Sequence, residues 1–342
     1  MSNQKAYAAE LPTGFTVRPA TAADAAIAAG LINDYAELTI GMRKLTEDEM
    51  RGLFSIPGFD AESSTRLILS PEGQPVGGVI VTDIASPPVH PSALGCVHHD
   101  FERLGLGTYL VDWAIERGRQ AIARVPDGVR VSLRFTLLGQ HEPTRRLFAK
   151  FNMELVRHSW VMSITLEQDP PPPHWPQDIA LCTFQDRPDV RAVYRAVHDA
   201  FQDHWGYVER SEEEGVQRME HMIASDKLFD PALWFLAMDG KEIAGVALCR
   251  AQTGEDASTA WVETLGVRRP WRRQGLGLAL LHHAFGEFYR RGQENVGLGV
   301  DAGSLTGATR LYEKAGMHIA QQASVYEVEL RPGQELGRQS LD

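Results

Sequence analysis

Cysteine is scarce in this chain. Cys96, Cys182 and Cys249 are the three thiols in 342 residues, and no two of them have the C-x-x-C spacing. The missing spacing excludes a zinc knuckle. A few widely separated cysteines are typical of proteins in a reducing compartment, so we expect a cytoplasmic location.

Long apolar runs are also absent. No run approaches the ~20 residues that a membrane-spanning helix requires. The first residues, Met1 to Lys5, lack the apolar core of a signal peptide. We therefore expect no membrane partner.

Positive charge is in deficit, with a formal net charge of −11. A nucleic acid would be repelled over most of such a surface, so we expect no nucleic-acid partner. An acidic surface favours a cationic acceptor such as an amine, but it is also an ordinary means of staying soluble. With 43% apolar and 23% charged residues, the chain has the composition of a globular protein and the length of two domains.

The most informative stretch of the chain is residues 272–277, with the sequence Arg-Arg-Gln-Gly-Leu-Gly. It lies between a strand-like run (261–267) and a helix-like run (278–290). Without side chains at Gly275 and Gly277, backbone N–H groups can converge on a phosphate, and the start of a helix adds its positive dipole end. Arg272 can add a charge-assisted contact to a second phosphate oxygen. The pattern predicts a pyrophosphate-binding turn, although one such match alone is weak.

The arrangement occurs twice, which strengthens this prediction. Gly105 corresponds to Gly275 at an offset of 170 residues, and Phe148 corresponds to Tyr312 at an offset of 164. Consecutive prolines within residues 169–176 separate the two copies, because they continue neither a helix nor a strand ladder. Each copy is large enough for its own core.

Each copy is predicted to run strand, two helices, several strands, helix, strand, helix, strand. In the second copy, apolar spacing and turn residues predict the following elements: helices at 189–201, 212–223, 276–290 and 306–315, and strands at 233–238, 243–250, 261–267, 296–300 and 324–330. Asp239-Gly240 predicts a hairpin between the first two of these strands.

This order, with R-x-x-G-x-G after the fourth strand and L-Y-x-x-x-G-M on the last helix, resembles the GNAT acyltransferase superfamily. The tandem pair resembles its mycothiol synthase group. The resemblance implies an α/β (α+β) fold of two tandem GNAT domains, each with a mixed, mostly antiparallel central sheet flanked by helices. The expected segments are an N-terminal tail (1–13), a degenerate domain (14–166), a linker (167–178), a catalytic domain (179–331) and a C-terminal tail (332–342).

GNAT enzymes carry an acyl group from acyl-CoA to an amine by direct attack on the thioester. Acetyl-CoA, or another acyl-CoA, is therefore the expected co-substrate, and no metal is expected. The resemblance assigns cofactor binding to the following residues: Leu265, Gly266, Val267, Arg272, Arg273, Gln274, Gly275, Leu276, Gly277, Leu278 and Ser304. Serine is a shorter donor than the asparagine often found at the last of these positions.

Tyr312 occupies the position where many family members place the acid that protonates the departing thiolate. A phenol with a pKa near ~10 can donate to such a thiolate. The alternative is an aromatic ring that only packs the last helix against the sheet. Glu263 is the candidate base that removes a proton from the amine, and its alternative is an exposed strand carboxylate.

The loop after the first helix of the second copy shapes the acceptor pocket in this family, which makes His204, Trp205 and Tyr207 the candidate acceptor residues. Their rings could hold a cation, or they could simply anchor the loop. Arg268, Arg269 and Arg273 could meet the 3′-phosphate of CoA or form a solvated basic cluster.

The first copy has lost the groups that handle protons. Glu102 stands where the second copy has Arg272, Ala93 replaces Glu263, and Phe148 replaces Tyr312. Catalysis is not expected there, but a backbone cradle could still bind an acyl-CoA as a structural ligand. The possible second CoA site comprises Val97, Arg103, Leu104, Gly105, Leu106, Gly107 and Thr108.

The leading hypothesis is an N-acyltransferase, transferring acetyl to the primary amine of a small molecule, in a monomer or weak homodimer. The alternative is a non-catalytic acyl-CoA-binding or sensing protein, which would not need the asymmetry between Tyr312 and Phe148. A dinucleotide-binding domain is disfavoured, because no G-x-G-x-x-G follows the first strand. The sequence does not define the acceptor.

Overall fold

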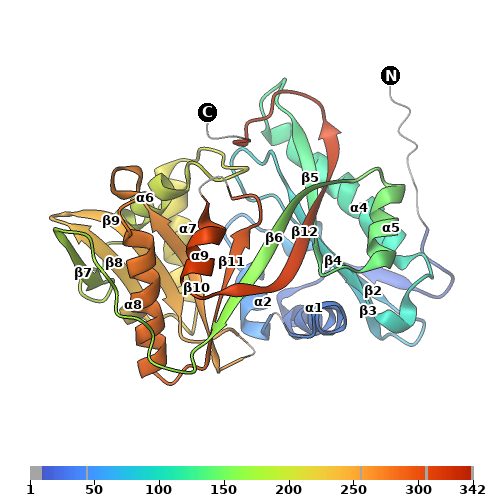
Figure 1. The fold of residues 1–342 in the computed structure, drawn as a ribbon. Coiled ribbons are helices and arrows are strands. Elements are labelled where there is room, and N and C mark those ends of the chain that lie inside the picture. The colour runs from blue at the N-terminus through green and yellow to red at the C-terminus, as the bar shows by residue number, and fades with distance from the viewer. Residues whose placement is uncertain (1–9, 44, 255, 305–306, 340–342) are drawn as a thin grey trace. The chain divides into compact units, whose positions relative to one another are not determined.

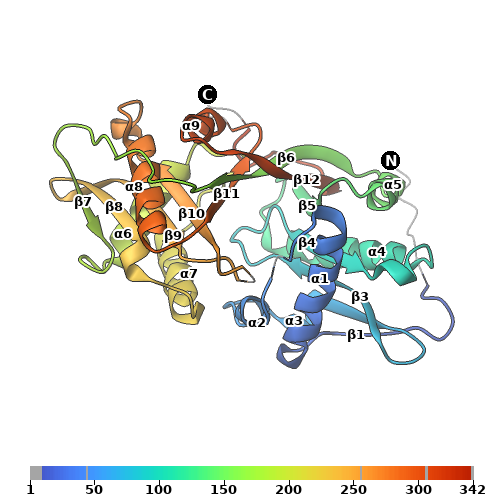
Figure 2. The same cartoon turned by 60° about the horizontal axis from the view of Figure 1, so that its bottom comes forward.

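The computed structural model describes residues 10–43, 45–254, 256–304 and 307–339 of the chain. These residues form two compact units. Unit 1 comprises the residues up to Arg157 together with Ala323–Leu336, and unit 2 comprises His158–Gln322 together with the residues from Gly337 onwards. Both units combine helices with a sheet, and Figures 1 and 2 show the elements of each from two directions.

Unit 1 is built on a sheet with the strand order β1-β2-β3-β4-β5-β12. Its strands are β1 (Thr16–Arg18), β2 (Thr65–Leu69), β3 (Pro75–Thr82), β4 (Ser92–Val97), β5 (Val131–Leu138) and the second part of β12 (His318–Arg331). Its helices are α1 (Ala25–Ile40), α2 (Glu47–Phe54), α3 (Ala61–Ser64), α4 (Leu106–Arg119) and α5 (Glu142–Lys150), with 3-10 turns η1 (Ala22–Asp24), η2 (His99–Phe101) and η3 (Gln120–Arg124).

Unit 2 has the strand order β6-β11-β10-β9-β8-β7. Its strands are β6 (Glu154–Thr165), β7 (Ile179–Thr183), β8 (Trp234–Asp239), β9 (Glu242–Arg250), β10 (Thr259–Val267) and β11 (Asn295–Asp301). Its helices are α6 (Val190–Phe201), α7 (Glu212–Ser225), α8 (Leu276–Arg290) and α9 (Ala308–Lys314), with 3-10 turns η4 (Pro231–Leu233) and η5 (Arg269–Trp271). Helix α8 lies on one face of this sheet, and α6 and α7 lie on the other (Figure 2).

The predicted elements of the second copy are present with small differences at their ends. Asp239 and Gly240 close the β8–β9 hairpin as predicted, with Gly240 at a φ of 57°. Strand β10 begins two residues earlier than predicted, and β12 begins at His318 rather than at Ser324. The predicted start of the last helix, Thr306, lies outside the described residues.

The fold class is confirmed. Among the described residues, the strands within each unit pair antiparallel with one exception, β4 with β5 in unit 1 and β10 with β11 in unit 2. In unit 2, one apolar core packs α8 and α9 against the sheet through Phe285, Phe288 and Tyr312, and a second packs α6 through Val193 and Ala196.

The last strand of each copy lies in the sheet of the other copy. Strand β6, which ends the first copy, pairs with β11 from Asn295↔Thr165 to Asp301↔Ser159. Strand β12, which ends the second copy, pairs with β5 from Ala323↔Leu138 to Arg331↔Val131. The segments expected from the repeat, 14–166 and 179–331, follow the order of the chain, whereas the compact units exchange this strand.

The proline-rich linker packs on helix α8, and the C-terminal tail is hydrogen-bonded to residues before β5. Trp175 of the linker lies 5.9 Å from the ring of His283 on α8, and that imidazole also meets Phe235 edge-on. The tail bonds to unit 1 through Gln334, whose N–H donates to the carbonyl of Gly128 at 2.7 Å. Of the two expected tails, residues 1–9 and 340–342 lie outside the described residues.

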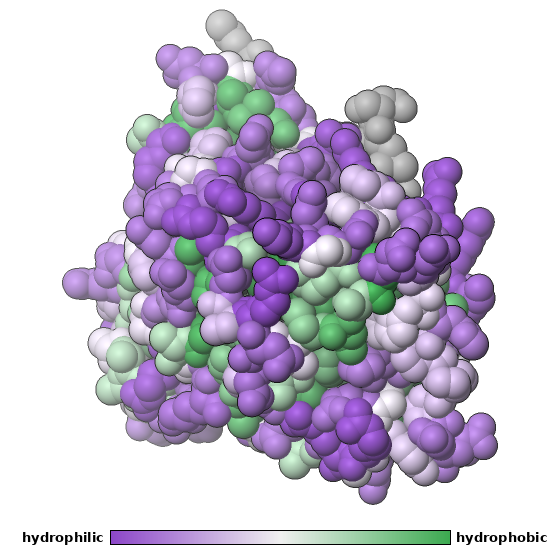
Figure 3. All heavy atoms as spheres, turned by 90° about the vertical axis from the view of Figure 1, so that its left-hand side faces the viewer, coloured by the Kyte–Doolittle hydropathy of each residue, from purple (hydrophilic) through white to green (hydrophobic). Residues whose placement is uncertain are grey.

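Within the described residues, no helix has both the length and the apolar character needed to cross a membrane. Polar residues cover most of the face in Figure 3, and apolar residues form small groups among them. The cytoplasmic location stays a prediction.

Candidate active site

Strands β10 and β11 separate halfway along β10. Their parallel pairing runs from Thr259↔Asn295 to Val262↔Leu298 and stops there. Beyond that point β10 stays paired with β9 as far as Val267↔Gly245, while β11 stays paired with β6. The two strands therefore diverge, and the backbone edge of β10 at residues 264–267 is released from β11.

Glu263 lies where this divergence begins. The register between β10 and β9 shifts between Val262 and Thr264, so Glu263 is the extra residue of a β-bulge. Bulges are frequent beside active sites, because they redirect a side chain out of the regular alternation. The Glu263 side chain is 45% exposed and lies 3.4 Å from Nε of Arg250. Its role as the base stays a prediction.

The turn after β10 has the geometry of an anion cradle. Arg273 and Gly275 both adopt the left-handed conformation, with φ values of 62° and 86°. Gly275 is the N-cap of the 15-residue helix α8 and offers no side chain to satisfy the first amides. These N–H groups are left for a ligand, at the positive end of the helix dipole. A Cβ at Gly277 would lie 3.1 Å from Leu311, so this glycine allows α8 and α9 to approach.

The side chain of Arg272 has protein partners in this turn. Its Nε donates to the carbonyl of Val267 at 3.0 Å, one Nη donates to the carbonyl of Ala200 at 3.0 Å, and the other lies 2.5 Å from Asp203. The guanidinium is thus engaged by strand, helix and loop. Its predicted contact with a phosphate oxygen stays a prediction.

Arg268 and Arg269 are also engaged. Arg268 donates to Asp199 at 3.0 Å and to Glu242 at 3.1 Å, and Arg269 is paired with Asp203. Both are held in ion pairs, although the side chain of Arg269 is still 55% exposed. Binding of the 3′-phosphate by these residues would have to break existing ion pairs, and it stays a prediction.

Tyr312 on α9 is buried, with 7% of its surface exposed. It belongs to the same apolar core as Val262, Leu298 and Val300 of the diverging strands. Burial raises the pKa of its phenol to about 12. The phenol is therefore protonated at neutral pH, as a general acid must be.

The edge of β10 that would meet a thioester is packed from the α6 side. A Cβ at Gly266 would lie 2.9 Å from Cβ of Ala200 and 3.2 Å from the ring of Phe201, so only glycine lets α6 come this close. The Phe201 ring in turn lies 4.2 Å from the imidazole of His204. One aromatic ring thus stands between the end of β10 and the candidate acceptor loop. Leu265 and Val267 flank this position on the strand, and their predicted contact with pantetheine stays a prediction.

Residues 202–211 connect α6 to α7 and contain the three candidate acceptor residues. Burial lowers the pKa of His204, and the charges of Asp301 and Arg272 also act on this imidazole, so it faces both the end of β11 and the turn. The hydroxyl of Tyr207 lies 2.9 Å from Nε2 of His198. A cavity of about 620 Å³ is lined by residues of α6 and by Glu209 and Arg210 of the same loop, but by none of the three acceptor candidates.

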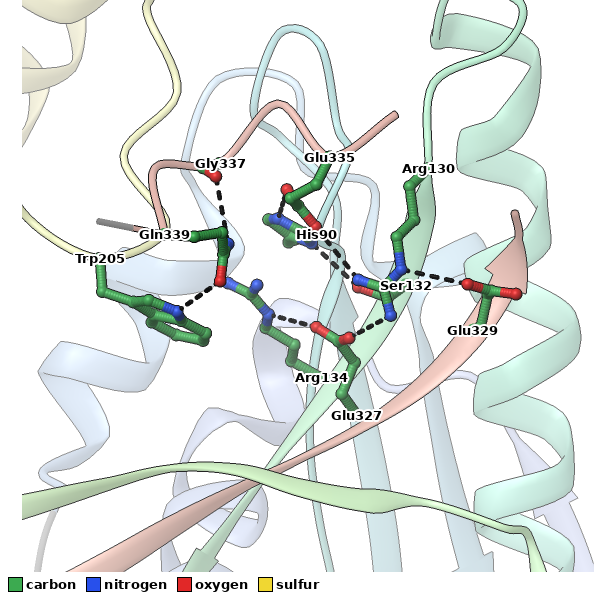
Figure 4. Close-up of polar contacts among 10 residues, drawn as sticks. All are labelled: His90, Arg130, Ser132, Arg134, Trp205, Glu327, Glu329, Glu335, Gly337 and Gln339. Atoms are coloured by element: carbon green, nitrogen blue, oxygen red, sulfur yellow. Dashed lines mark hydrogen bonds and ion pairs between the residues drawn. The ribbon is translucent and has the colours of Figure 1, made fainter. Parts of the chain in front are cut away.

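The C-terminal tail also holds this loop, which the sequence reasoning missed. The N–H of Gly206 donates to the carbonyl of Arg338 at 2.8 Å, and the N–H of Arg338 donates to the carbonyl of Tyr207 at 3.0 Å. The indole N–H of Trp205 donates to the side-chain carbonyl of Gln339 at 3.0 Å (Figure 4). No local pattern could reveal these pairs, because the partners are more than a hundred residues apart in the sequence.

Ser304 precedes α9. Its hydroxyl accepts a hydrogen bond from the N–H of Ala308 at 3.3 Å, and its own N–H donates to the carbonyl of Asp301. These bonds shape the turn between β11 and α9. Its predicted contact with pantetheine stays a prediction.

The first copy repeats the cradle almost unchanged. Arg103 and Gly105 have φ values of 62° and 91°, and a Cβ at Gly107 would lie 3.1 Å from Leu147, as at the equivalent glycine of the second copy. A cavity of about 790 Å³ lies against this turn. Five of the seven predicted second-site residues line it, namely Val97, Arg103, Gly105, Gly107 and Thr108.

The first copy lacks the other features. The pairing of β4 with β3 runs from Gly77↔Val97 to Thr82↔Ser92 without a bulge, and Ala93 is buried within it. Phe148 packs between Phe135 and Tyr326. Glu102 turns to His141, with 3.3 Å between carboxylate and Nε2. This copy has a cradle and a cavity, which Tyr35 also lines, but it has no bulged carboxylate at the position of Glu263 and no tyrosine at the position of Tyr312.

Among the described residues, His98, His99 and Asp100 form a group whose atoms lie close enough to share a metal ion. They are consecutive residues, and Nδ1 of His98 already accepts the N–H of Asp100 at 3.3 Å. The absence of a metal from the chemistry stays a prediction.

Comparisons with known proteins identify related acetyltransferases. The sequence model of the acetyltransferase (GNAT) family matches residues 191–317. The mycothiol acetyltransferase of Thermobispora bispora is 28% identical over 281 residues, covering 81% of this chain and 86% of that protein. The mycothiol acetyltransferase of Catenulispora acidiphila is 29% identical over 266 residues, covering 76% and 79%.

Solved structures agree. A GCN5-related N-acetyltransferase from Sphaerobacter thermophilus superposes with a TM-score of 0.78 at 35% identity, over 96% of this chain and 99% of that one. A tandem GNAT protein from the clavulanic acid biosynthesis pathway has the same fold, with a TM-score of 0.67 at 16% identity over 94% of this chain and 100% of that one. The chain therefore belongs to the GNAT family of N-acetyltransferases, in a tandem arrangement that resembles the mycothiol acetyltransferases.

Proposed function

We propose that unit 2 transfers an acyl group, which we expect to be acetyl, from acyl-CoA to the primary amine of a small molecule. The observation that carries this proposal is the asymmetry between two otherwise matching turns. The cradle occurs in both copies, but the bulged Glu263 and the buried Tyr312 occur in the second copy alone. Binding needs only the cradle, whereas transfer also needs proton handling.

The proposed reaction proceeds by direct attack. The turn at 272–277 holds the pyrophosphate, and the released edge of β10 binds the pantetheine arm and polarises the thioester carbonyl. Glu263 removes a proton from the amine, directly or through water, because a protonated amine has no lone pair to attack with. The new C–N bond forms as the C–S bond breaks, and Tyr312 gives its proton to the departing thiolate.

The acceptor is proposed to be an amine related to mycothiol, by analogy with the two named relatives. The test is a thiol-release assay with acetyl-CoA and longer acyl-CoAs against a panel of amines that includes mycothiol-related amines. Stoichiometric release of CoA and formation of an amide with one acceptor class would support the proposal. CoA release that does not depend on any amine would contradict it.

We further propose that the first copy retains an acyl-CoA as a structural ligand. The supporting observation is the cavity of about 790 Å³ against a turn with the same backbone conformation as the second copy. Glu102 also lines this cavity, and its carboxylate lies 3.3 Å from Nε2 of His141, so its charge is a feature of the cavity that disfavours a phosphate.

Native mass spectrometry tests this second role. Gly275→Trp fills the turn of the second copy, and Gly105→Trp fills that of the first. One CoA that stays bound in Gly275→Trp and is lost in Gly105→Trp would support a structural ligand. Loss of all CoA in Gly275→Trp would show that the first copy is empty.

A further inference from the structure

Asp203 lies at the start of the candidate acceptor loop and is almost completely buried, with 3% of its surface exposed. Its carboxylate is shared by Arg272 of the candidate phosphate-binding turn and by Arg269 of η5, which leads into that turn. Nε of Arg269 donates to it at 3.0 Å, and Nη1 of Arg272 lies 2.5 Å away. The hydrogen bonds from Arg269, followed by those from Arg272, hold the pKa of this carboxyl well below its usual range, so it is ionised at neutral pH.

Arg272 extends this connection to the strand and helix around it. The same guanidinium that meets Asp203 donates to the carbonyls of Val267 and Ala200. One side chain thus joins the end of β10, the end of α6 and the first residues of the loop. Charge-assisted hydrogen bonds in a buried setting have well-defined geometry, so these parts cannot move independently without breaking them.

The loop continues from Asp203 directly into the acceptor candidates. His204 packs on Phe201, and its N–H donates to the carbonyl of that residue at 3.0 Å. The tail holds Gly206 and Tyr207 from the other side. Asp203 is therefore the point at which this loop joins the turn that would hold CoA.

The first copy has no such connection. The positions equivalent to Asp203, Arg269 and Arg272 are Glu37, His99 and Glu102. Helix α1 continues to Ile40, so Glu37 is an exposed helical residue. The copy without counterparts of Tyr312 and Glu263 also lacks the aspartate–arginine link, as expected if the link serves the transfer reaction rather than the fold.

We propose that Asp203 is a positioning residue that couples acyl-CoA binding at residues 272–277 to ordering of the acceptor loop at residues 203–207. The inference rests on the proposed function of unit 2. When pyrophosphate immobilises the turn, Arg269 and Arg272 are immobilised with it, and their bonds to Asp203 order the loop. The enzyme would then assemble its acceptor site after the acyl donor is bound. Couplings between sites are typically about 5- to 150-fold in an equilibrium constant.

Hydrogen–deuterium exchange with CoA as the probe tests this coupling in the full chain. The amides of His204, Gly206 and Tyr207 are hydrogen-bonded and should exchange measurably. In the wild type, CoA should slow exchange at residues 274–278 and, by about fivefold or more, at residues 203–207. In Asp203→Asn, CoA should still slow exchange at the turn, but the change in the loop should disappear.

Asp199→Asn is the matched control, because Asp199 also pairs with an arginine near the turn, Arg268, but lies on α6, outside the loop. It should keep the CoA-dependent change. If Asp203→Asn only loosened the loop in general, loop exchange would be faster by the same factor with and without CoA. The ratio of the two exchange rates would then equal that of the wild type, which would overturn the proposal. If Asp203→Asn does not fold, Arg269→Gln removes an exposed partner of the same carboxylate and should reduce the ratio.

The experiment also separates this inference from the proposed function. Absence of any CoA effect at residues 274–278 would contradict the proposed cofactor site itself. An effect at the turn with none in the wild-type loop would contradict the coupling and leave the cofactor site standing. Steady-state kinetics give a second test of the coupling. Asp203→Asn should raise the acceptor KM by a larger factor than it lowers kcat.

Discussion

The carboxylate of Glu263 lies 3.4 Å from Nε of Arg250, and the same guanidinium lies 3.0 Å from Asp226 at the end of α7. The candidate base is therefore held at its bulge by a cation that is itself fixed from the neighbouring helix. An ion pair on both sides of this guanidinium fixes the place of the carboxylate beside the divergence of β10 and β11.

Glu263→Gln should remove the base and keep the shape of the side chain. We expect kcat to fall by about 10²- to 10⁴-fold, and the acidic limb of the pH–rate profile to disappear. Steady-state rates between pH 5 and 9 check this. Glu294→Gln, an exposed carboxylate in the turn before β11, serves as the control and should behave as wild type. An unchanged acidic limb would remove Glu263 from the mechanism.

Tyr312→Phe should lower kcat by about 10²- to 10⁴-fold and change the Kd of CoA by less than about twofold. Because burial raises the pKa of this phenol to about 12, deprotonation should not reduce the wild-type rate until well above pH 10. Turnover and CoA binding are measured on the same preparation. Full activity in the phenylalanine variant would reduce Tyr312 to a packing residue.

Gly275→Ala should weaken CoA binding although there is open space for a methyl group. Its φ of 86° is a left-handed conformation that costs an L-residue about 1–2 kcal/mol. Gly286→Ala is the matched control, because this glycine lies inside α8, also with open space, and has ordinary helical geometry. Chemical denaturation should show Gly275→Ala destabilised and Gly286→Ala stabilised by about 0.5–1 kcal/mol. Equal changes in the free energy of unfolding in the two variants would contradict a left-handed conformation at Gly275.

Asp203 should contribute stability that depends on pH. A carboxyl whose pKa is lowered in the folded state stabilises that state above the unfolded pKa of about 3.9, and the contribution is lost as pH falls further. Asp203→Asn should therefore be less stable than wild type at pH 7, with the difference shrinking below pH 4. Denaturant unfolding at pH 7, 5, 4 and 3 measures this. A constant difference would show that the carboxylate charge is not the cause.

Removal of the residues after Leu336 should free the acceptor loop from its tail. The loop would lose the two backbone bonds to Arg338 and the bond from Trp205 to Gln339. We expect a higher acceptor KM and, because the proposed coupling between loop and turn is reciprocal, a smaller rise in the Kd of CoA. Gln339→Ala, which removes one of the three bonds, should give a smaller rise. An acceptor KM equal to that of the full chain would show that the tail has no part in acceptor binding.

Much of the local structure could be predicted from the sequence, because local residues determine it. The glycines of the turn, the Asp239-Gly240 hairpin and the apolar spacing of α6 each act within a few residues. The bulge at Glu263 was not predicted, since it depends on the register with a neighbouring strand. The family resemblance identified the candidate carboxylate without explaining its geometry.

The contacts of Arg272 show why long-range contacts could not be predicted from the sequence. Its acceptor Asp203 lies 69 residues away in the chain, and a sequence pattern does not reveal which partner a long cation will find. The exchange of β6 and β12 was hidden for a related reason. A duplicated sequence predicts that each copy ends in a strand, but it does not predict into which sheet that strand inserts.

The exchanged strands have a consequence for dissecting this protein. A cut between residues 167 and 178 would separate the two copies by sequence, yet each fragment would carry away the strand that completes the other fragment's sheet. Neither piece would be an independent domain, and each would expose an unpaired sheet edge prone to aggregation. Co-expressed fragments should instead complement each other, because the two copies fold as a single unit.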